Sequence, residues 1–251
     1  MHTPLCHHAE GEPTEYAAQA ARIGLTEIGF TEHAPMPGDD FDNWRMLERD
    51  LNLYIEKIDQ AATENPAVTV RKSLEIDFVP CYEDWIRDLA NRQTWDYLIG
   101  SVHYIGDKWS FDHPDHRESW EGRDIDAAWA EYFELLRQSA ALGVFDIIGH
   151  CDLIKVFGDQ PSGDCSAMWR PFLDEVKRQD IAIEINTNGV NKPCGEMYPS
   201  PALLEMAAGI DVYARSIVDT GLRLILAENT DDGVMGPAYR PGQPPSEFSA
   251  S

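Results

Sequence analysis

Short apolar stretches alternate along the chain with longer stretches of helical periodicity. Apolar residues at helical spacing predict helices over residues 12–23, 47–64, 82–93, 125–142, 166–179 and 201–219. Continuous apolar stretches between them predict strands over residues 25–30, 68–79, 96–105, 144–150, 181–187 and 222–226. This alternation predicts parallel strands joined by helical crossovers, in about six or seven strand–helix units.

Proline and glycine mark the boundaries of these elements. Pro13 suits the first turn of the first helix, and Gly24 suits its exit. Residues 35–43 form a loop rich in Pro, Gly and Asp, and residues 106–123 are expected to form a long polar loop. A loop of that length inside a compact domain is usually functional or mobile. The last stretch, residues 236–251, is dense in Pro, Gly and Ser and is expected to be disordered.

The composition fits one large α/β domain. The chain has 251 residues, of which 43% are hydrophobic, enough to bury a substantial core. It contains no apolar run near the ~20 residues that a membrane span needs and no basic, apolar signal region at its start. We therefore expect a cytoplasmic protein. Its five cysteines are widely spaced and form no CxxC pair, so reduced thiols are expected.

The net charge of −24 argues against a nucleic-acid partner, because such binding depends on Lys and Arg that neutralise phosphates. It argues equally against adsorption to an anionic membrane surface. Most of the carboxylates are expected to form a solubilising shell. A small phosphorylated metabolite remains a suitable partner, provided that bound metal cations concentrate positive charge at its site.

Six side chains able to bind metal stand where apolar strands give way to polar loops. Side chains that must meet from distant parts of a chain are well held at the carboxyl ends of parallel strands, as in a barrel with its active site on one face. A single histidine at such a place is more often structural, but six at equivalent places favour a shared site. They are His2, His8, His33, Glu75, His103 and His150.

The chemistry of this set favours a metallohydrolase. Imidazole and carboxylate together suit zinc, iron or manganese better than calcium or magnesium. Sites of mixed nitrogen and oxygen ligands without thiolate are usually catalytic and leave a position open for water. Two metals that share a bridging hydroxide would provide a nucleophile and bind a phosphoryl group. The sequence has no GxSxG elbow, no P-loop and no GxGxxG motif.

Several of these segments together resemble one family. The histidinol-phosphate phosphatases of the PHP (polymerase and histidinol phosphatase) superfamily are similar to HTPLCHHAEG, IGFTEHAPMP, EIDFVP, YLIGSVHYI with the following WSFD, IIGHCDLIKVFG, and IEINTNG with KPCGEMYPSP. The resemblance runs from residue 1 to about 206, and GHCDLIKVFG and the KPCGEMYPSP segment are specific to this phosphatase branch.

The resemblance implies a distorted (β/α)7 TIM-like barrel over residues 1–235, divergent after about residue 208, with up to three divalent metals (Zn, Mn or Fe) at the carboxyl ends of its strands. It implies hydrolysis of L-histidinol phosphate to L-histidinol and phosphate, a step of histidine biosynthesis, through a hydroxide that bridges the metals. Glu75 corresponds to the family's bridging carboxylate, and the five histidines correspond to its histidine ligands. Asp112 and Lys192 are candidate contacts to the amine and the phosphate of the substrate.

The chain departs from the family pattern at three places. The family opens with two histidines separated by one residue; His2 matches the second, and the first has no counterpart, so either the start was assigned late or one ligand has been lost. Asn191 stands where the family has an Arg before the lysine, which removes a bidentate phosphate contact. At the family's closing SDAH segment this chain has residues 227–231, with Asn229 and Asp231 as the candidate metal or acid groups.

These departures leave two alternatives to the histidinol-phosphate phosphatase open. One is a PHP hydrolase of another small phosphoester, and the other is a catalytically impaired relative that binds metal or phosphate without turnover. The sequence does not indicate the native metal or the oligomeric state.

Overall fold

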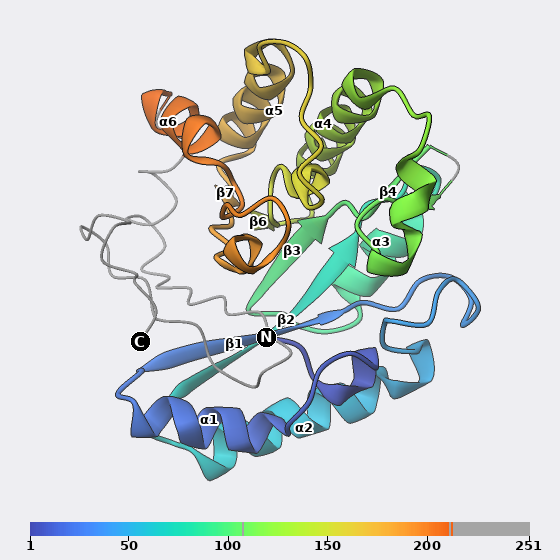
Figure 1. The fold of residues 1–251 in the computed structure, drawn as a ribbon. Coiled ribbons are helices and arrows are strands. Elements are labelled where there is room, and N and C mark those ends of the chain that lie inside the picture. The colour runs from blue at the N-terminus through green and yellow to red at the C-terminus, as the bar shows by residue number, and fades with distance from the viewer. Residues whose placement is uncertain (107, 211, 213–251) are drawn as a thin grey trace.

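A parallel β-sheet forms the centre of the protein (Figure 1). The computed structural model describes residues 1–106, 108–210 and 212. Within this range five strands pair in the order β1-β2-β3-β6-β7, and every pairing is parallel. The strands are β1 (Glu27–His33), β2 (Thr69–Asp77), β3 (Tyr97–Ser101), β6 (Ile147–Ile148) and β7 (Ala182–Ile183).

Helices cover the sheet along the crossovers between its strands. In Figure 1, α1 and α2 lie together beside β1 and β2, whereas α4, α5 and α6 lie along the other half of the sheet. The helices are α1 (Pro13–Arg22), α2 (Leu51–Glu64), α3 (Glu83–Asn91), α4 (Ile125–Ala141), α5 (Ser166–Gln179) and α6 (Pro201–Gly209). Short 3-10 helices are η1 (Pro4–Cys6), η2 (Glu48–Asp50), η3 (Pro114–Trp120), η4 (Leu153–Lys155) and η5 (Asn188–Asn191).

Side chains in the sequence account for several of these boundaries. A capping box joins Glu12 and Glu15 at the start of α1, and Pro13 occupies the first turn as expected. The Asp124 carboxylate accepts a hydrogen bond from the Ala127 N–H at the start of α4. The helices α1, α2 and α4 contact the strands, whose inner residues are buried, and α5 packs against α4. The predicted alternation of strand and helix is thus confirmed over the described residues.

The register of the strands aligns their carboxyl ends. His33 pairs with Glu75 between β1 and β2, and Asp77 pairs with Ser101 between β2 and β3. In β2 the first residue is exposed while the last five are buried, so the strand enters the interior at its carboxyl end. Tyr54 of α2 holds the first two strands together, because its hydroxyl contacts the carbonyl oxygens of Phe30 at 2.9 Å and Ser73 at 2.7 Å. The polar groups that follow each strand therefore meet at one edge of the sheet.

Residues 106–123 differ from the long loop predicted from the sequence. The strands β4 (Tyr104–Ile105) and β5 (Trp109–Ser110) form an antiparallel pair, and η3 follows. Trp120 is buried against Trp109, and its indole N–H donates to the Phe111 carbonyl at 2.8 Å. The prediction was wrong because Phe111 and Trp120 anchor this polar segment in the main hydrophobic core, and Trp109 packs against it.

Other predictions reach beyond the described residues. The α6 helix ends at Gly209, and the predicted strand 222–226 and tail 236–251 lie outside the described range. The five parallel strands show the α/β class, while closure of the sheet into a barrel and the extent of a single domain over residues 1–235 stay predictions. No described helix is long and apolar enough to cross a membrane.

Candidate metal centre

The first three residues lie beside β1 and bring His2 to the carboxyl edge of the sheet. The amino group of Met1 donates to the Gly29 carbonyl at 3.0 Å, and the Thr31 N–H donates to the Met1 carbonyl at 2.8 Å. The chain then turns through η1, and the His2 side chain is only 5% exposed. An additional backbone segment therefore supplies a histidine next to the one that ends β1.

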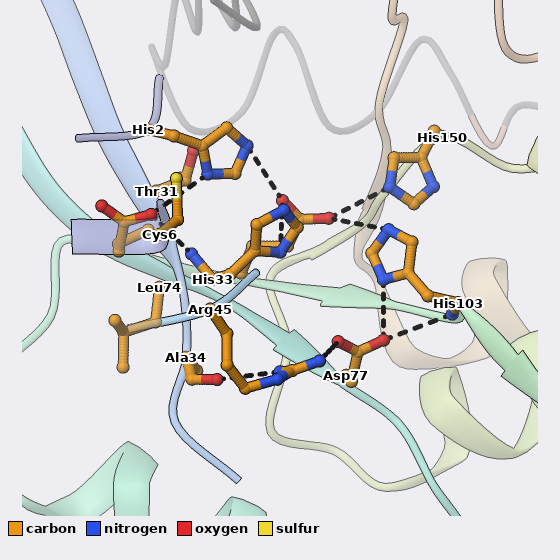
Figure 2. Close-up of polar contacts among 12 residues, drawn as sticks. His2, Cys6, Thr31, His33, Ala34, Arg45, Leu74, Asp77, His103 and His150 are labelled. Atoms are coloured by element: carbon orange, nitrogen blue, oxygen red, sulfur yellow. Dashed lines mark hydrogen bonds and ion pairs between the residues drawn. The ribbon is translucent and has the colours of Figure 1, made fainter. Parts of the chain in front are cut away.

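Glu75 stands between two pairs of histidines. Figure 2 labels these histidines, His2 with His33 and His103 with His150. Its Oε2 lies 3.5 Å from His2 Nε2 and 3.7 Å from His33 Nδ1. Its Oε1 lies 3.0 Å from His150 Nε2 and 3.7 Å from His103 Nε2. Each carboxylate oxygen thus faces its own pair, and both groups of three have ligand atoms within 4.8 Å of one another.

The imidazole rings on one side of Glu75 pack tightly together. His2 and His33 are stacked, with ring centroids 4.3 Å apart and an angle of 16° between the rings. His8 lies at the rim, exposed to solvent, with its ring centroid 5.2 Å from that of His33. Its Nδ1 is 3.0 Å from the Cys6 carbonyl, and Cys6 Sγ is 3.7 Å from its Nε2. The structure therefore gathers all six predicted candidates in one place.

Burial and neighbouring charges shift the pKa values of His33 and Glu75. Burial lowers the pKa of His33 well below its usual range, and the attraction of Glu75 does not reverse that effect. Burial alone would raise the pKa of Glu75, but His33, His150 and His103 together hold it well below its ordinary value. One ionised carboxylate thus faces several imidazoles, of which His33 is held neutral.

The donor set fits divalent metal ions. The buried Nδ1 atoms of His33 and His150 have no hydrogen-bond partner among the described residues. Because His33 is held neutral, the lone pairs of its Nδ1 and of Glu75 Oε2, 3.7 Å apart, would face one another, an arrangement that a cation between them would stabilise. Such nitrogen and oxygen ligands suit zinc and the neighbouring transition metals. Burial raises the pKa of the nearby Cys6 thiol, which favours its neutral form over thiolate, the form that binds metal.

Three further carboxylates, which the sequence reasoning missed, support the histidines. Glu32 Oε1 lies 3.4 Å from His2 Nδ1, while its Oε2 accepts hydrogen bonds from the N–H and the hydroxyl of Thr3. Glu184 Oε2 accepts the N–H of His150 at 2.7 Å. These contacts fix the backbone and the rings around the candidate ligands.

Asp77 is the third of these carboxylates, and it contacts His103. Its Oδ1 lies 2.7 Å from His103 Nδ1. Burial by itself would lower the pKa of His103, but the charge and hydrogen bond of Asp77 raise it to about 10. The alternation of strand side chains places Asp77 on the same face as Glu75, which is the signal that could have found it.

Trp44 forms an aromatic side of the centre. Its ring lies edge-on to His33 with centroids 4.7 Å apart and edge-on to His103 at 5.4 Å. It also stacks on Tyr104, with 11° between the rings. Trp44 is half-buried, so part of its surface is open beside the histidines. Its position in the loop after β1 gave no periodic signal in the sequence.

The predicted substrate contacts have different surroundings. Burial raises the pKa of Asp112, while the charges of His103 and His150 oppose that rise, so its carboxyl group lies within electrostatic reach of the centre. Lys192 is exposed at the end of η5, and no hydrogen bond or ion pair joins its ammonium to the described histidines. Asn229 and Asp231 lie outside the described residues.

Lys155, another residue that sequence reasoning missed, fastens the segment after His150. Its side chain is 1% exposed, and its ammonium lies 3.2 Å from Asp152 Oδ2 and 2.9 Å from the Met197 carbonyl. Asp152 Oδ2 also accepts the Ser200 N–H at 2.7 Å. The loop that carries His150 is thereby tied to residues 196–200.

Comparison with known proteins agrees with this geometry. The family model described as PHP domain matches residues 1–188. A Deinococcus radiodurans protein named "probable histidinol-phosphatase" is 41% identical over 209 residues, which are 83% of this chain and 79% of that protein. The histidinol-phosphatase of Bacillus subtilis is 28% identical over 215 residues, 76% of this chain and 80% of the relative.

Solved structures share the fold. A Listeria monocytogenes structure has a TM-score of 0.74 at 24% identity and covers 87% of this chain and 96% of its own. The histidinol phosphate phosphatase of Lactococcus lactis, complexed with Zn, L-histidinol and phosphate, has a TM-score of 0.69 at 23% identity, over 84% of this chain and 80% of its own.

Proposed function

Because the chain belongs to the PHP domain family, we propose that it is a metal-dependent phosphomonoesterase that hydrolyses L-histidinol phosphate to L-histidinol and phosphate. The relative at 41% identity bears the name of this activity, and the segments that carry the resemblance run through the candidate centre. The reaction would serve histidine biosynthesis, in the cytoplasm.

The position of Glu75 is the observation that carries this proposal. A carboxylate whose two oxygens each face a separate pair of imidazoles can bridge two metal ions. In known enzymes, two metal ions about 3.5–4 Å apart commonly catalyse displacement at phosphorus. A phosphate monoester, with its two negative charges, suits such a centre in a chain whose net charge is otherwise −24.

Up to three divalent ions are proposed for the centre. His2 and His33 would hold one ion with Glu75, and His103 and His150 would hold a second with the same carboxylate. His8, at the open rim beside His2 and His33, would contribute to a further position. Zinc, manganese and iron all accept this mixture of nitrogen and oxygen ligands.

The chain's own residues would bind and orient the substrate around the ions. The metal ions would supply positive charge for the phosphoryl group and lower the pKa of water. The carboxyl group of Asp112 would meet the amine of histidinol phosphate, and Lys192 would approach the phosphate from the loop after η5. The half-buried face of Trp44 would exclude water from one side of the centre.

The same proposal extends to the overall architecture. The parallel order β1-β2-β3-β6-β7, with candidate ligands after successive strands, supports a sheet that belongs to a distorted (β/α)7 barrel. In that barrel the segment with Asn229 and Asp231 would follow the last strand and complete the site. The small substrate calls for neither a nucleic-acid nor a membrane partner.

The test is phosphate release by the purified full chain. Protein loaded with manganese or zinc would be incubated with L-histidinol phosphate, and a chelated sample and a Glu75→Gln variant would serve as controls. We expect release that depends on the metal and on Glu75. Selective release from other phosphomonoesters would show a different substrate, and stoichiometric metal without turnover on any of them would contradict the enzyme assignment.

A further inference from the structure

The carboxylate of Asp77 lies beside the metal centre with both of its oxygens already engaged. Oδ1 accepts the His103 N–H at 3.2 Å and faces His103 Nδ1 at 2.7 Å. Oδ2 accepts a hydrogen bond from the guanidinium of Arg45 at 3.0 Å. Asp77 is 1% exposed, so these protein groups, rather than water, satisfy it. Figure 2 shows the chain of contacts from Arg45 through Asp77 to His103.

The contact with Asp77 fixes the form of the His103 ring. In the neutral ring, the form that binds a metal ion, a proton on Nδ1 that is donated to the carboxylate leaves the lone pair on Nε2. Nε2 is the atom that faces Glu75 Oε1, at 3.7 Å. Asp77 also fixes the orientation of the ring, since its carboxylate contacts both the backbone N–H and the side chain of His103. The free nitrogen is therefore presented toward the bridging carboxylate.

Arg45 is buried in the interior, where it contacts Asp77. It is 3% exposed, and its three donor nitrogens reach Asp42 at 2.7 Å, the Ala34 carbonyl at 3.0 Å and Asp77 at 3.0 Å. Its guanidinium carbon also lies 4.5 Å from the centroid of the Trp44 ring. Because Ala34 follows β1 and Asp77 ends β2, Arg45 joins the carboxyl ends of both strands.

We propose that Arg45 and Asp77 are positioning residues for His103, and that Asp77 is not itself a metal ligand. This inference rests on the proposed metal centre, but it does not depend on which phosphoester is hydrolysed. The competing assignment is real, because ligand atoms of His33, Asp77 and His103 lie within 4.8 Å of one another. The contacts of Arg45 distinguish the two assignments. Its buried guanidinium neutralises the carboxylate at Oδ2 and would repel a metal cation there, while His103 occupies Oδ1.

The two assignments predict opposite results when Arg45 is removed. If Asp77 were a ligand, Arg45→Gln would free its carboxylate and strengthen metal binding or leave it unchanged. If Asp77 positions His103, Arg45→Gln should weaken zinc and manganese binding. Loss of such supporting partners typically costs about 10- to 100-fold in metal affinity. Affinity and stoichiometry would be measured on the full chain by competition with a chromophoric chelator.

Asp77→Asn is the companion variant. We expect about 10- to 100-fold weaker binding with the metal count at saturation unchanged. The double variant should lose less metal-binding free energy than the sum of the losses in the two single variants, because both residues act through one chain of contacts. Arg45→Lys should recover part of the affinity that Arg45→Gln loses. Asp42→Asn is the matched control, since Asp42 contacts Arg45 but not Asp77, and its effect should be smaller than that of Arg45→Gln.

A spectroscopic measurement tests the positioning without metal or activity. In metal-free protein, proton and nitrogen-15 spectra should show the His103 Nδ1 proton in a hydrogen bond to a carboxylate, and Asp77→Leu should abolish that signal. A saturating metal count that drops in Asp77→Asn, stronger or unchanged binding in Arg45→Gln, or an unchanged His103 Nδ1 proton signal in Asp77→Leu would overturn the inference. Wild-type protein with these responses but no phosphate release would refute the proposed function and leave the inference standing.

Discussion

Replacing Lys155 with methionine tests how the loop after His150 is held. Methionine preserves much of the apolar stem of Lys155 but removes the ammonium that contacts Asp152 Oδ2 at 3.2 Å and the Met197 carbonyl at 2.9 Å. Both Lys155 and Asp152 have side chains that are 1% exposed, so water does not replace the lost contacts. The variant leaves a buried carboxylate that still accepts the Ser200 N–H.

The size of the effect follows from the pKa of Asp152. Burial raises that pKa to about 6 even with Lys155 present, and it would rise further without the ammonium. At pH 7 Asp152 is ionised in the wild type, one unit above its pKa of about 6, but would be protonated in the variant. The variant therefore loses about 1.4 kcal/mol of folding free energy, which corresponds to one pKa unit. The Met197 carbonyl, left without its donor, costs roughly 1–3 kcal/mol more. We expect Lys155→Met to lower the free energy of unfolding by about 3 kcal/mol at pH 7.

The assay is urea unfolding of the metal-free chain at pH 7 and pH 5. Because the raised pKa makes protonation of Asp152 favourable to folding, wild-type Asp152 is already largely protonated at pH 5, and the difference between the two proteins should shrink by about 1.4 kcal/mol. Lys57→Met, which breaks a surface ion pair with Glu12, is the control and should cost less than about 1 kcal/mol. A loss below about 1 kcal/mol at pH 7, or an equal loss at both pH values, would refute the reasoning.

Three further outcomes are expected. Glu75→Gln should lower metal affinity by more than about 100-fold, as measured by metal content after dialysis, because both groups of candidate ligands share this carboxylate; full metal retention would contradict this. Tyr54→Phe should cost about 1–3 kcal/mol in urea unfolding, since the buried carbonyls of Phe30 and Ser73 lose the one hydroxyl proton that they share. The metal-free chain should lose stability between about pH 6.5, the unfolded value, and pH 10, because the folded pKa of His103 is about 10 and protonated His103 stabilises the fold. Thermal unfolding in the presence of a chelator would measure this loss. A metal-free chain that becomes more stable as the pH rises over this range would contradict it.

Four of the six candidate ligands could be found from the sequence because each one lies in or just after a recognisable strand. The apolar stretches before His33, His103 and His150 indicated where polar side chains would emerge, and parallel pairing brings those positions together. Glu75 was predictable for the same reason, as it lies near the end of β2. His2 was predicted with the same set, but it does not follow a strand, and its position depends on backbone contacts with β1 that no local pattern indicates.

The residues that support the candidate ligands could not be predicted from the sequence, because their partners are distant along the chain. Arg45 lies in an irregular segment, and only the fold shows that its guanidinium joins Ala34 and Asp77. The hairpin of β4 and β5 was missed because each strand has only two residues, too few for a periodic signal. Lys155 carries a charge, which normally indicates exposure, yet its pairing with Asp152 allows it to be buried.

The pairing of His33 with Glu75 across β1 and β2 limits how the length of the chain can vary. One residue inserted into β2 between Ser73 and Glu75 would turn the carboxylate to the opposite face of the sheet, because side chains alternate along a strand. The same insertion among residues 24–26 or 65–68, which precede the two strands, would leave this pairing unchanged. Natural variation in length should therefore gather at the amino-terminal edge of the sheet and be absent from the last residues of its strands.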